Sequence, residues 1–159
     1  MSLLRARQHP VQLGDAGKDG VRIQFGALIW RRRKDKIQIL LVKSRRSKRW
    51  IIPKGWPVHG QTPVGAASRE AWEEAGVKGR ASSICIGLYS YMKLPRDSDI
   101  PFPCVVAVFP LEAREVADSY PEALERKRKW MSPKKAAEKL VSPELSQIVR
   151  RFDPKRLGL

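Results

Sequence analysis

The chain has 159 residues, of which 42% are hydrophobic, and it carries 32 Lys and Arg against 16 Asp and Glu, a formal net charge of +16. This length and hydrophobic content are typical of a single globular domain with a core of its own. No apolar run approaches the roughly 18 residues of a membrane span, and MSLLRARQHP has no apolar signal segment, so we expect a cytoplasmic protein without a membrane partner.

The first third of the chain predicts an arm, three strands and a loop. Residues 1–20 mix Gly, Pro, Asp and Lys without periodicity, which predicts a mobile N-terminal arm. We expect one domain over residues 21–153 and a C-terminal tail at 154–159. The strand candidates are VRIQFGALIW at 21–30, IQILLVKS at 37–44 after the charged turn 31–36, and RWIIP at 49–53, which Pro53 ends. The Gly- and Pro-containing segment KGWPVHGQ, at 54–61, predicts a loop.

Three helices share one start signal, a Ser or Thr cap followed by Pro. It occurs at Thr62, Ser132 and Ser142, and predicts helices over 63–75, 133–140 and 143–152. Gly76 ends the first helix, where a left-handed residue is favoured. Further strands are predicted at 82–92 and 103–113, where Ile, Val, Tyr and Phe are abundant, and a short one at 127–131.

Three glutamates lie close together on the first predicted helix. Glu70, Glu73 and Glu74 share one helix face, where their like charges repel. The face with Val64, Ser68, Ala71 and Ala75 is expected to pack on a sheet, so the glutamates are expected to point away from the core, toward the loop at 54–60. One interpretation is a solvated surface face; the other is a set of oxygen ligands for a hard divalent cation.

The residues before this helix favour the second interpretation. Gly55, five residues, Gln61, seven residues and then REAWEEAGV resemble the Nudix box, Gly-x5-Glu-x7-Arg-Glu-U-x-Glu-Glu-x-Gly-U with U apolar. The six matching fixed positions are Gly55, Arg69, Glu70, Glu73, Glu74 and Gly76. With each residue type at about 7% usage, such a match arises by chance about 10⁻⁵ times in a chain of this length. Chance is therefore a poor explanation.

The resemblance implies a fold, an activity and a set of site residues. The fold would be an α/β/α sandwich on a mixed β-sheet, and the activity Mg²⁺- or Mn²⁺-dependent hydrolysis of pyrophosphate bonds. The metal ligands would be Glu70, Glu73, Glu74 and the carbonyl of Lys54. Glu70 and Glu73 would be catalytic, with Arg69 orienting a carboxylate. The base that activates water would be a glutamate of the box or one from a later loop, for which Glu122 and Glu125 are candidates unless they are simply solvated. Gln61 stands where the family has Glu. Because Gln lacks the charge, an ionic interaction with Arg69 or an indirect contact to the metal would be weaker, and activity would be reduced or retuned.

The flanks of the box narrow the resemblance to one branch of the family. RWIIPKGW, REAWEEAGVKG and ERKRKWMSPKKAAEKL look like the diphosphoinositol polyphosphate phosphohydrolases, which also act on diadenosine polyphosphates. Such substrates are polyanions, and the two basic clusters of this chain, at residues 31–49 and 125–130, suit them. The predicted substrate-binding residues are Lys43, Arg45, Arg46, Lys48, Arg49, Arg126 and Arg128.

Two other functions fit the positive charge. One is a nucleic-acid-binding protein with a site weakened by Gln61, and the other is an enzyme acting on the 5′ end of RNA. No Phe/Tyr-rich RNA-binding signature occurs, and the arginines gather around the box, which favours the enzyme with a polyphosphorylated small molecule. For Trp50, Trp56, Trp72 and Trp130 we expect packing over stacking on an adenine.

Overall fold

The computed structural model describes residues 8–11 and 22–159. Most of the predicted arm, residues 1–7 and 12–20, lies outside the described residues. Within 8–11, Val11 is bound to the loop before the first helix, because its N–H donates to the Gln61 carbonyl at 2.7 Å and its carbonyl accepts from the Gly60 N–H at 2.9 Å. In the described part of the chain, no helix is both long and apolar enough to cross a membrane.

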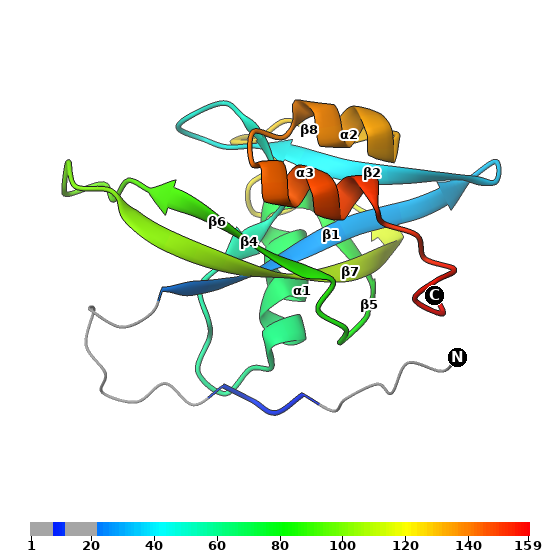
Figure 1. Ribbon diagram of the computed structural model, residues 1–159, viewed down its shortest axis with the longest axis horizontal. Coiled ribbons are helices and arrows are strands. Elements are labelled where there is room, and N and C mark those ends of the chain that lie inside the picture. Colours follow the sequence, from blue (N-terminus) through cyan, green and yellow to red (C-terminus); the bar gives the residue numbers. More distant parts are fainter. Residues whose placement is uncertain (1–7, 12–21) are drawn as a thin grey trace.

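The strands form one mixed sheet (Figure 1). The strand bounds are β1 (Ile23–Arg33), β2 (Lys36–Lys43), β3 (Trp50–Ile51), β4 (Lys54–Gly55), β5 (Val77–Ala81), β6 (Gly87–Lys93), β7 (Phe102–Val116) and β8 (Arg128–Met131). The order is β3-β2-β1-β7-β5, with β4 paired to β1, β6 to β7 and β8 to β2. Only β1 and β7 pair in parallel among the described strands.

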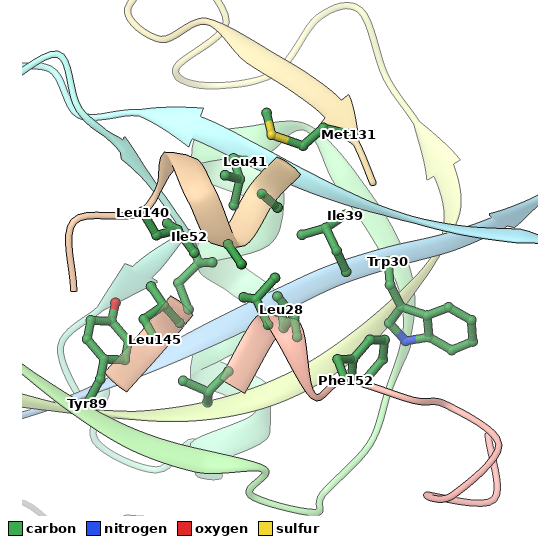
Figure 2. Close-up of a cluster of buried hydrophobic side chains, with 14 of the residues drawn as sticks. Leu28, Trp30, Ile39, Leu41, Ile52, Tyr89, Met131, Leu140, Leu145 and Phe152 are labelled. Carbon is green, nitrogen blue, oxygen red and sulfur yellow. The ribbon is translucent and has the colours of Figure 1, made fainter. Parts of the chain in front are cut away.

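Helices cover both faces of this sheet (Figure 1). The helix α1 (Pro63–Ala75) packs on one face, and α2 (Pro133–Lys139) and α3 (Pro143–Arg150) pack on the other. Successive residues of β1 serve the two layers in turn: Ala27 and Ile29 contact the α1 layer, and Leu28 and Trp30 the α2–α3 layer. The α2–α3 layer is drawn in Figure 2, where Leu28, Ile39, Leu41 and Trp30 meet Leu145 and Phe152. The predicted α/β/α sandwich is confirmed.

The helix start signals give the correct first residues. Thr62 Oγ1 accepts from the Gly65 N–H at 3.0 Å, and Gly76 caps α1 with φ of +67°. The helix α1 has the predicted bounds, whereas α2 ends one residue and α3 two residues earlier than predicted. A strand forms in each predicted region, but the one predicted at 82–92 begins only at Gly87 and the one predicted at 49–53 is limited to Trp50–Ile51. The strand β7 reaches Val116, and the β1–β2 turn is only Lys34 and Asp35, both at positive φ.

Two strands were not predicted. Lys54–Gly55 lies in the predicted loop but pairs as β4 with Phe25 and Gly26 of β1, so the loop prediction was wrong at these two residues. Val77–Ala81 forms β5 against β7, with a register shift between Lys78 and Gly79. Neither segment has the alternating apolar pattern by which strands are predicted.

The last residues pack against the domain. Leu157 and Leu159 contact the α2–α3 core, and the Leu159 N–H donates to the Pro154 carbonyl at 2.9 Å. The domain boundary at residue 153 stays a prediction.

Candidate active site

The helix α1 turns one of its three glutamates inward. Its buried residues are Ala66, Ala67, Ala71, Glu74 and Ala75. Ala71 and Ala75 therefore face the sheet as predicted, but Val64 and Ser68 are only partly buried. The prediction that all three glutamates point away from the core was wrong for Glu74, which is 6% exposed. A buried carboxylate requires a partner, and the chain supplies one.

That partner is Arg126, from the segment before β8. Arg126 Nη2 lies 3.6 Å from Glu74 Oε1, and each side chain is 8% exposed. Arg126 also donates from Nη1 to the Lys43 carbonyl at 3.1 Å. The second oxygen of Glu74, Oε2, is buried and has no hydrogen-bond partner among the described residues. One acceptor of this carboxylate therefore remains open to a cation or a donor.

Glu70 packs directly over the backbone of β4. A Cβ atom added to Gly55 would overlap the Glu70 carboxyl group. The pairing of Gly55 with Phe25 of β1 fixes β4 at this position. The motif glycine is thus required because the α1 carboxylate and the β4 backbone approach more closely than a side chain allows.

Burial and like charges raise the pKa of both carboxyls. Burial raises the pKa of Glu70 to about 7, and the charges of Glu73 and Glu122 act in the same direction. Burial also raises the pKa of Glu74 to about 7, although Arg126 and Lys54 act against it. Burial and like charges favour the protonated carboxyls, and a bound divalent cation would favour their ionised forms.

Glu122 joins the site from the loop between β7 and β8. Its N–H donates to the Glu73 carbonyl at 3.0 Å. Its Oε1 lies 3.4 Å from Arg126 Nε and 3.4 Å from Arg45 Nη1. Glu125 contacts Arg45 at 3.1 Å, with 49% of its side chain exposed. Of the two candidates for a later base, Glu122 is the one close to Glu70 and Glu74.

Arg69 and Glu73 lie at the outer side of α1. Arg69 Nε donates to Glu73 Oε1 at 2.8 Å, and half of the Arg69 side chain is exposed. Neither residue lines the cavity into which Glu70 and Glu74 point. Gln61 has a buried Oε1 without a hydrogen-bond partner in the described chain. Arg69 therefore pairs with Glu73, one turn away on the same helix, and not with Gln61.

A cavity of about 1120 Å³ opens beside these carboxylates. It is lined by seven basic residues, Arg22, Arg45, Arg46, Lys54, Lys93, Arg96 and Arg126, and three acidic ones, Glu70, Glu74 and Asp97. The basic residues come from five separate parts of the chain, and the fold gathers them around the two α1 glutamates. Such a cavity suits a polyanion.

The predicted substrate-binding residues divide between this cavity and other positions. Arg45, Arg46 and Arg126 line the cavity, whereas Lys43, Lys48, Arg49 and Arg128 do not. Arg128 donates from Nη1 to the Ala75 carbonyl at 2.7 Å, where it satisfies the C-terminal end of α1. Lys43 Nζ lies 5.1 Å from the centre of the Trp50 ring.

Sequence reasoning missed three basic residues of the cavity. Arg22, Lys93 and Arg96 are not part of either basic cluster. Arg22 precedes β1, and the β1–β7 pairing places that end of β1 beside the start of β7. Because only this long-range pairing brings them to the site, no local signal distinguishes them from ordinary surface cations.

Lys54 contributes a side chain as well as the predicted carbonyl. Its Nζ lies 4.8 Å from the centre of the Tyr91 ring, and the side chain lines the cavity. Burial lowers the pKa of Lys54, and the charge of Glu74 opposes this. The Lys54 ammonium group therefore lies close enough to the Glu74 carboxylate for their charges to interact.

The donor set fits a hard divalent cation. Glu70, Glu74 and Glu122 offer carboxylate oxygens, which Mg²⁺ and Mn²⁺ prefer, and Glu74 Oε2 is a buried acceptor without a partner. Over residues 8–11 and 22–159, no three His, Cys, Asp or Glu side chains are already arranged as a closed metal site. Binding would therefore require small side-chain movements.

Comparisons with known proteins agree with this geometry. The NUDIX domain family model matches residues 21–152. "Nudix hydrolase 13, mitochondrial" of Arabidopsis thaliana is 33% identical over 110 residues, which is 65% of this chain and 54% of that protein. "Diphosphoinositol polyphosphate phosphohydrolase 3-alpha" of Homo sapiens is 28% identical over 76% of this chain and 70% of that protein. This chain thus spans about half the length of the Arabidopsis relative.

The solved structures show the same fold. The C. elegans Ap4A hydrolase aligns with a TM-score of 0.61 at 23% identity, over 84% of this chain and 96% of that chain. The E. coli dihydroneopterin triphosphate pyrophosphohydrolase aligns with a TM-score of 0.62 at 18% identity, over 84% of this chain and 97% of that chain. The match to the family model over residues 21–152, together with the box and the fold, shows that the chain belongs to the Nudix family.

Proposed function

We propose that this protein is a Mg²⁺- or Mn²⁺-dependent pyrophosphohydrolase that cleaves a phosphoanhydride bond in a highly phosphorylated small molecule. The substrate classes suggested by the relatives are diphosphoinositol polyphosphates and diadenosine polyphosphates. The observation that carries the proposal is the cavity in which two glutamates of the box lie among seven basic residues. A carboxylate site for a cation thus adjoins a surface for phosphates.

The cation would be held by Glu70, Glu74 and Glu122, with Glu73 and the Lys54 carbonyl as further ligands. A bound divalent ion shields phosphoryl oxygens and lowers the pKa of water. The chain itself neutralises the remaining phosphate charge with Arg45, Arg46 and the Lys54 ammonium.

Proton transfer is assigned to a glutamate of this group. Glu70 lines the cavity beside the basic residues, so in the proposed reaction its carboxylate is placed to accept a proton from the attacking water. Arg126 keeps Glu74 in place through their ion pair, and Arg69 does the same for Glu73. The proposed work of these arginines is to position carboxylates.

The test is phosphate release from a panel of substrates in Mg²⁺. The panel contains a diphosphoinositol polyphosphate, diadenosine tetraphosphate, and capped and triphosphorylated RNA. We expect Glu70→Gln and Glu74→Gln to lower turnover by at least about 100-fold, while Glu115→Gln, on the exposed end of β7, matches the parent protein. Cleavage of RNA alone would replace the small-molecule assignment by an RNA 5′-end activity, and equal activity of all variants would contradict the site.

A further inference from the structure

A second cavity, of about 760 Å³, lies beside β8, which pairs with β2 alone among the described strands. Its lining residues come from β2, β3, β8 and α2, and β8 leads through Ser132 directly into α2 (Figure 1). Within the described chain, no residue lines both this cavity and the active-site cavity beside Glu70. The second cavity is therefore a separate site, and neither the box nor the proposed function gives it a role.

Two indole rings line the second cavity. Trp50 packs against the α2–α3 core and Trp130 against the α1 core, as expected for packing residues, but both stay only partly buried. The Arg31 guanidinium lies 4.0 Å from the centre of the Trp130 ring, and Lys43 Nζ lies 5.1 Å from the centre of the Trp50 ring. Arg31 Nε also donates to Gln38 Oε1 at 2.8 Å, so a residue of the cavity wall orients this cation. Aromatic surface and positive charge thus occur together.

Three lysines complete the wall of the second cavity. Lys129, Lys135 and Lys139 are exposed, and none of them has an ion pair with another described residue. The acidic residue of the lining is Glu138. In the active-site cavity, by contrast, Arg126 is paired with a buried glutamate. The three lysines are therefore available to an anion from outside the protein.

Positive charge continues on both sides of the second cavity. On one side, Gln38 is two residues from the start of β2, and the turn that precedes β2 is basic. The exposed basic residues around this turn are Arg32, Arg33, Lys34 and Lys36, against one acid, Asp35. On the other side, Trp50 directly follows Lys48 and Arg49, which are exposed and do not line the active-site cavity. A ligand that meets both sides is longer than a single nucleotide.

We propose that the second cavity is a docking site for single-stranded nucleic acid, separate from the active site. Bases stack on the two indole rings, and the three lysines contact phosphates. A duplex keeps its bases inside its own stack and cannot offer them to Trp50 and Trp130. An anionic membrane would meet the lysines but would leave the rings in the cavity without a partner. This inference goes beyond the proposed function and does not depend on it.

The first experiment measures whether bases contribute to binding. Fluorescence anisotropy follows two labelled strands with 5′-hydroxyl ends, a uridine dodecamer and an abasic strand with the same number of phosphates, added to the full chain in chelator. We expect the uridine strand to bind at least about tenfold more tightly, which is the usual effect of stacking one base. Equal binding of the two strands would show attraction by net charge alone and would overturn the inference.

Indole resonances locate the bound strand. The chain has five tryptophans, and each side-chain N–H gives a signal in ¹⁵N-labelled protein. The uridine strand should shift the signals of Trp50 and Trp130 and leave that of Trp30, which is 2% exposed, in place. A shift confined to Trp56, which lines the active-site cavity, would place the strand there and contradict the docking site.

Lys135→Gln tests the phosphate contacts without a change in the core, because Lys135 is exposed. We expect it to lower the slope of log Kd against log salt concentration by about 0.7, which is the counterion effect of one phosphate contact on a single strand. The matched control is Lys155→Gln, which makes the same charge change at an exposed residue outside the cavity lining and should keep the parent slope. The same slope in both variants would contradict a phosphate contact at the cavity.

Two comparisons separate this site from the active site. Lys135→Gln should hydrolyse the small substrate at the parent rate, and Glu70→Gln should bind the uridine strand as tightly as the parent protein. Loss of strand binding in Glu70→Gln would mean that the strand occupies the active site, and would overturn the proposal. If no phosphoanhydride is hydrolysed, the proposed function fails while strand binding at Trp50 and Trp130 still supports the docking site.

Other anions give the last comparison. UMP should bind far more weakly than the dodecamer, because it meets only part of the basic surface. The dodecamer should also displace any phosphatidylglycerol vesicles that bind the protein. UMP that binds as tightly as the dodecamer, or vesicles that the dodecamer cannot displace, would overturn the assignment to a nucleic-acid strand.

Discussion

Arg126 and Glu74 form an ion pair inside the domain, with 3.6 Å between Arg126 Nη2 and Glu74 Oε1 and 8% of each side chain exposed. The pair joins the segment before β8 to α1. It explains how a helix can turn a glutamate of the box inward, because the charge that burial would otherwise penalise has a partner. Arg126, a cation of the second basic cluster, is thus committed to the protein's own carboxylate.

Removing the cation of this pair should destabilise the fold. Arg126→Met leaves the Glu74 carboxyl buried without an opposite charge, and we expect a loss of about 3 kcal/mol in the free energy of unfolding at pH 8. At pH 6 the loss should be smaller, since the Glu74 carboxyl, with a pKa of about 7, is already largely protonated. Urea unfolding at the two pH values measures both.

Arg114→Met is the matched control for this prediction. Arg114 pairs with Glu112 at 3.3 Å, but 59% of its side chain is exposed, so the change should cost less than about 1 kcal/mol. Equal losses for Arg114→Met and Arg126→Met would show that burial of the Arg126 pair is of no consequence.

The close approach of Glu70 to β4 predicts a severe effect of a single methyl group. In Gly55→Ala the new Cβ overlaps the Glu70 carboxyl, which must therefore shift from its position. A displacement of about 1 Å at a reacting group lowers turnover on the order of 100-fold. The measurement is steady-state hydrolysis by Gly55→Ala, Glu70→Gln and the double variant. If the two changes act on the same group, the double variant is no slower than Glu70→Gln alone, and additive losses would refute that explanation.

Two glycines at positive φ, Gly76 at the end of α1 and Gly158, are expected to differ in the stability cost of a substitution. Gly76 and Gly158 have φ of +67° and +69°, but a Cβ on Gly76 would overlap the Tyr120 ring, whereas that on Gly158 meets open space. Asn tolerates the left-handed conformation, so Gly158→Asn should change stability by less than about 0.5 kcal/mol. Gly76→Asn should cost about 2 kcal/mol, through overpacking against Tyr120. Chemical unfolding of both variants tests this, and a harmless Gly76→Asn would contradict the crowding.

The raised pKa values predict that metal-free protein loses stability as pH rises. The pKa of Glu74 is about 7 in the folded protein against an ordinary value of 4.5, so the folded state holds this proton more tightly than the unfolded state. The resulting stability is fully present below pH 4.5 and is lost as pH rises through 7. We expect the loss to be on the order of 2 kcal/mol between pH 5 and pH 8, measured by thermal unfolding in chelator.

Bound Mg²⁺ and the substitution Glu74→Gln should each reduce this loss of stability at high pH. Mg²⁺ is expected to raise the Tm more at pH 8 than at pH 6, because it competes with the protons of Glu70 and Glu74. Glu74→Gln should make the pH dependence in chelator shallower and leave the part that is due to Glu70, whereas Glu115→Gln should leave it as in the parent protein. An unchanged slope in Glu74→Gln would mean that Glu74 does not carry the proton.

The sequence predicts much of the fold because its signals are local. The cap and proline pairs at Thr62, Ser132 and Ser142 fix three helix starts, and apolar runs indicate the long strands. The strand β4 has two residues and β5 contains a glycine and a register shift, so both depend on pairing with distant strands. These two strands form because neighbouring strands pair with them, and their own residue types do not indicate a strand.

The candidate site, like the fold, has residues that local sequence signals identify and residues that depend on distant contacts. The box identifies Gly55, Glu70 and Glu74, which lie within one short stretch of chain. The inward direction of Glu74 depends on Arg126, 52 positions later in the sequence. The cavity residues Arg22 and Lys93 come together only through the pairing of β7 with both β1 and β6. Periodicity and motif spacing carry no information on such distant contacts.

The central claim is that a divalent cation binds between Glu70 and Glu74. Titration of the full chain with Mn²⁺, followed by electron paramagnetic resonance of the free ion, measures this without any substrate. We predict saturable binding that Glu70→Gln and Glu74→Gln each weaken by at least about tenfold, and that Glu115→Gln leaves unchanged. Mn²⁺ binding that is equally strong in all four proteins would contradict the claim.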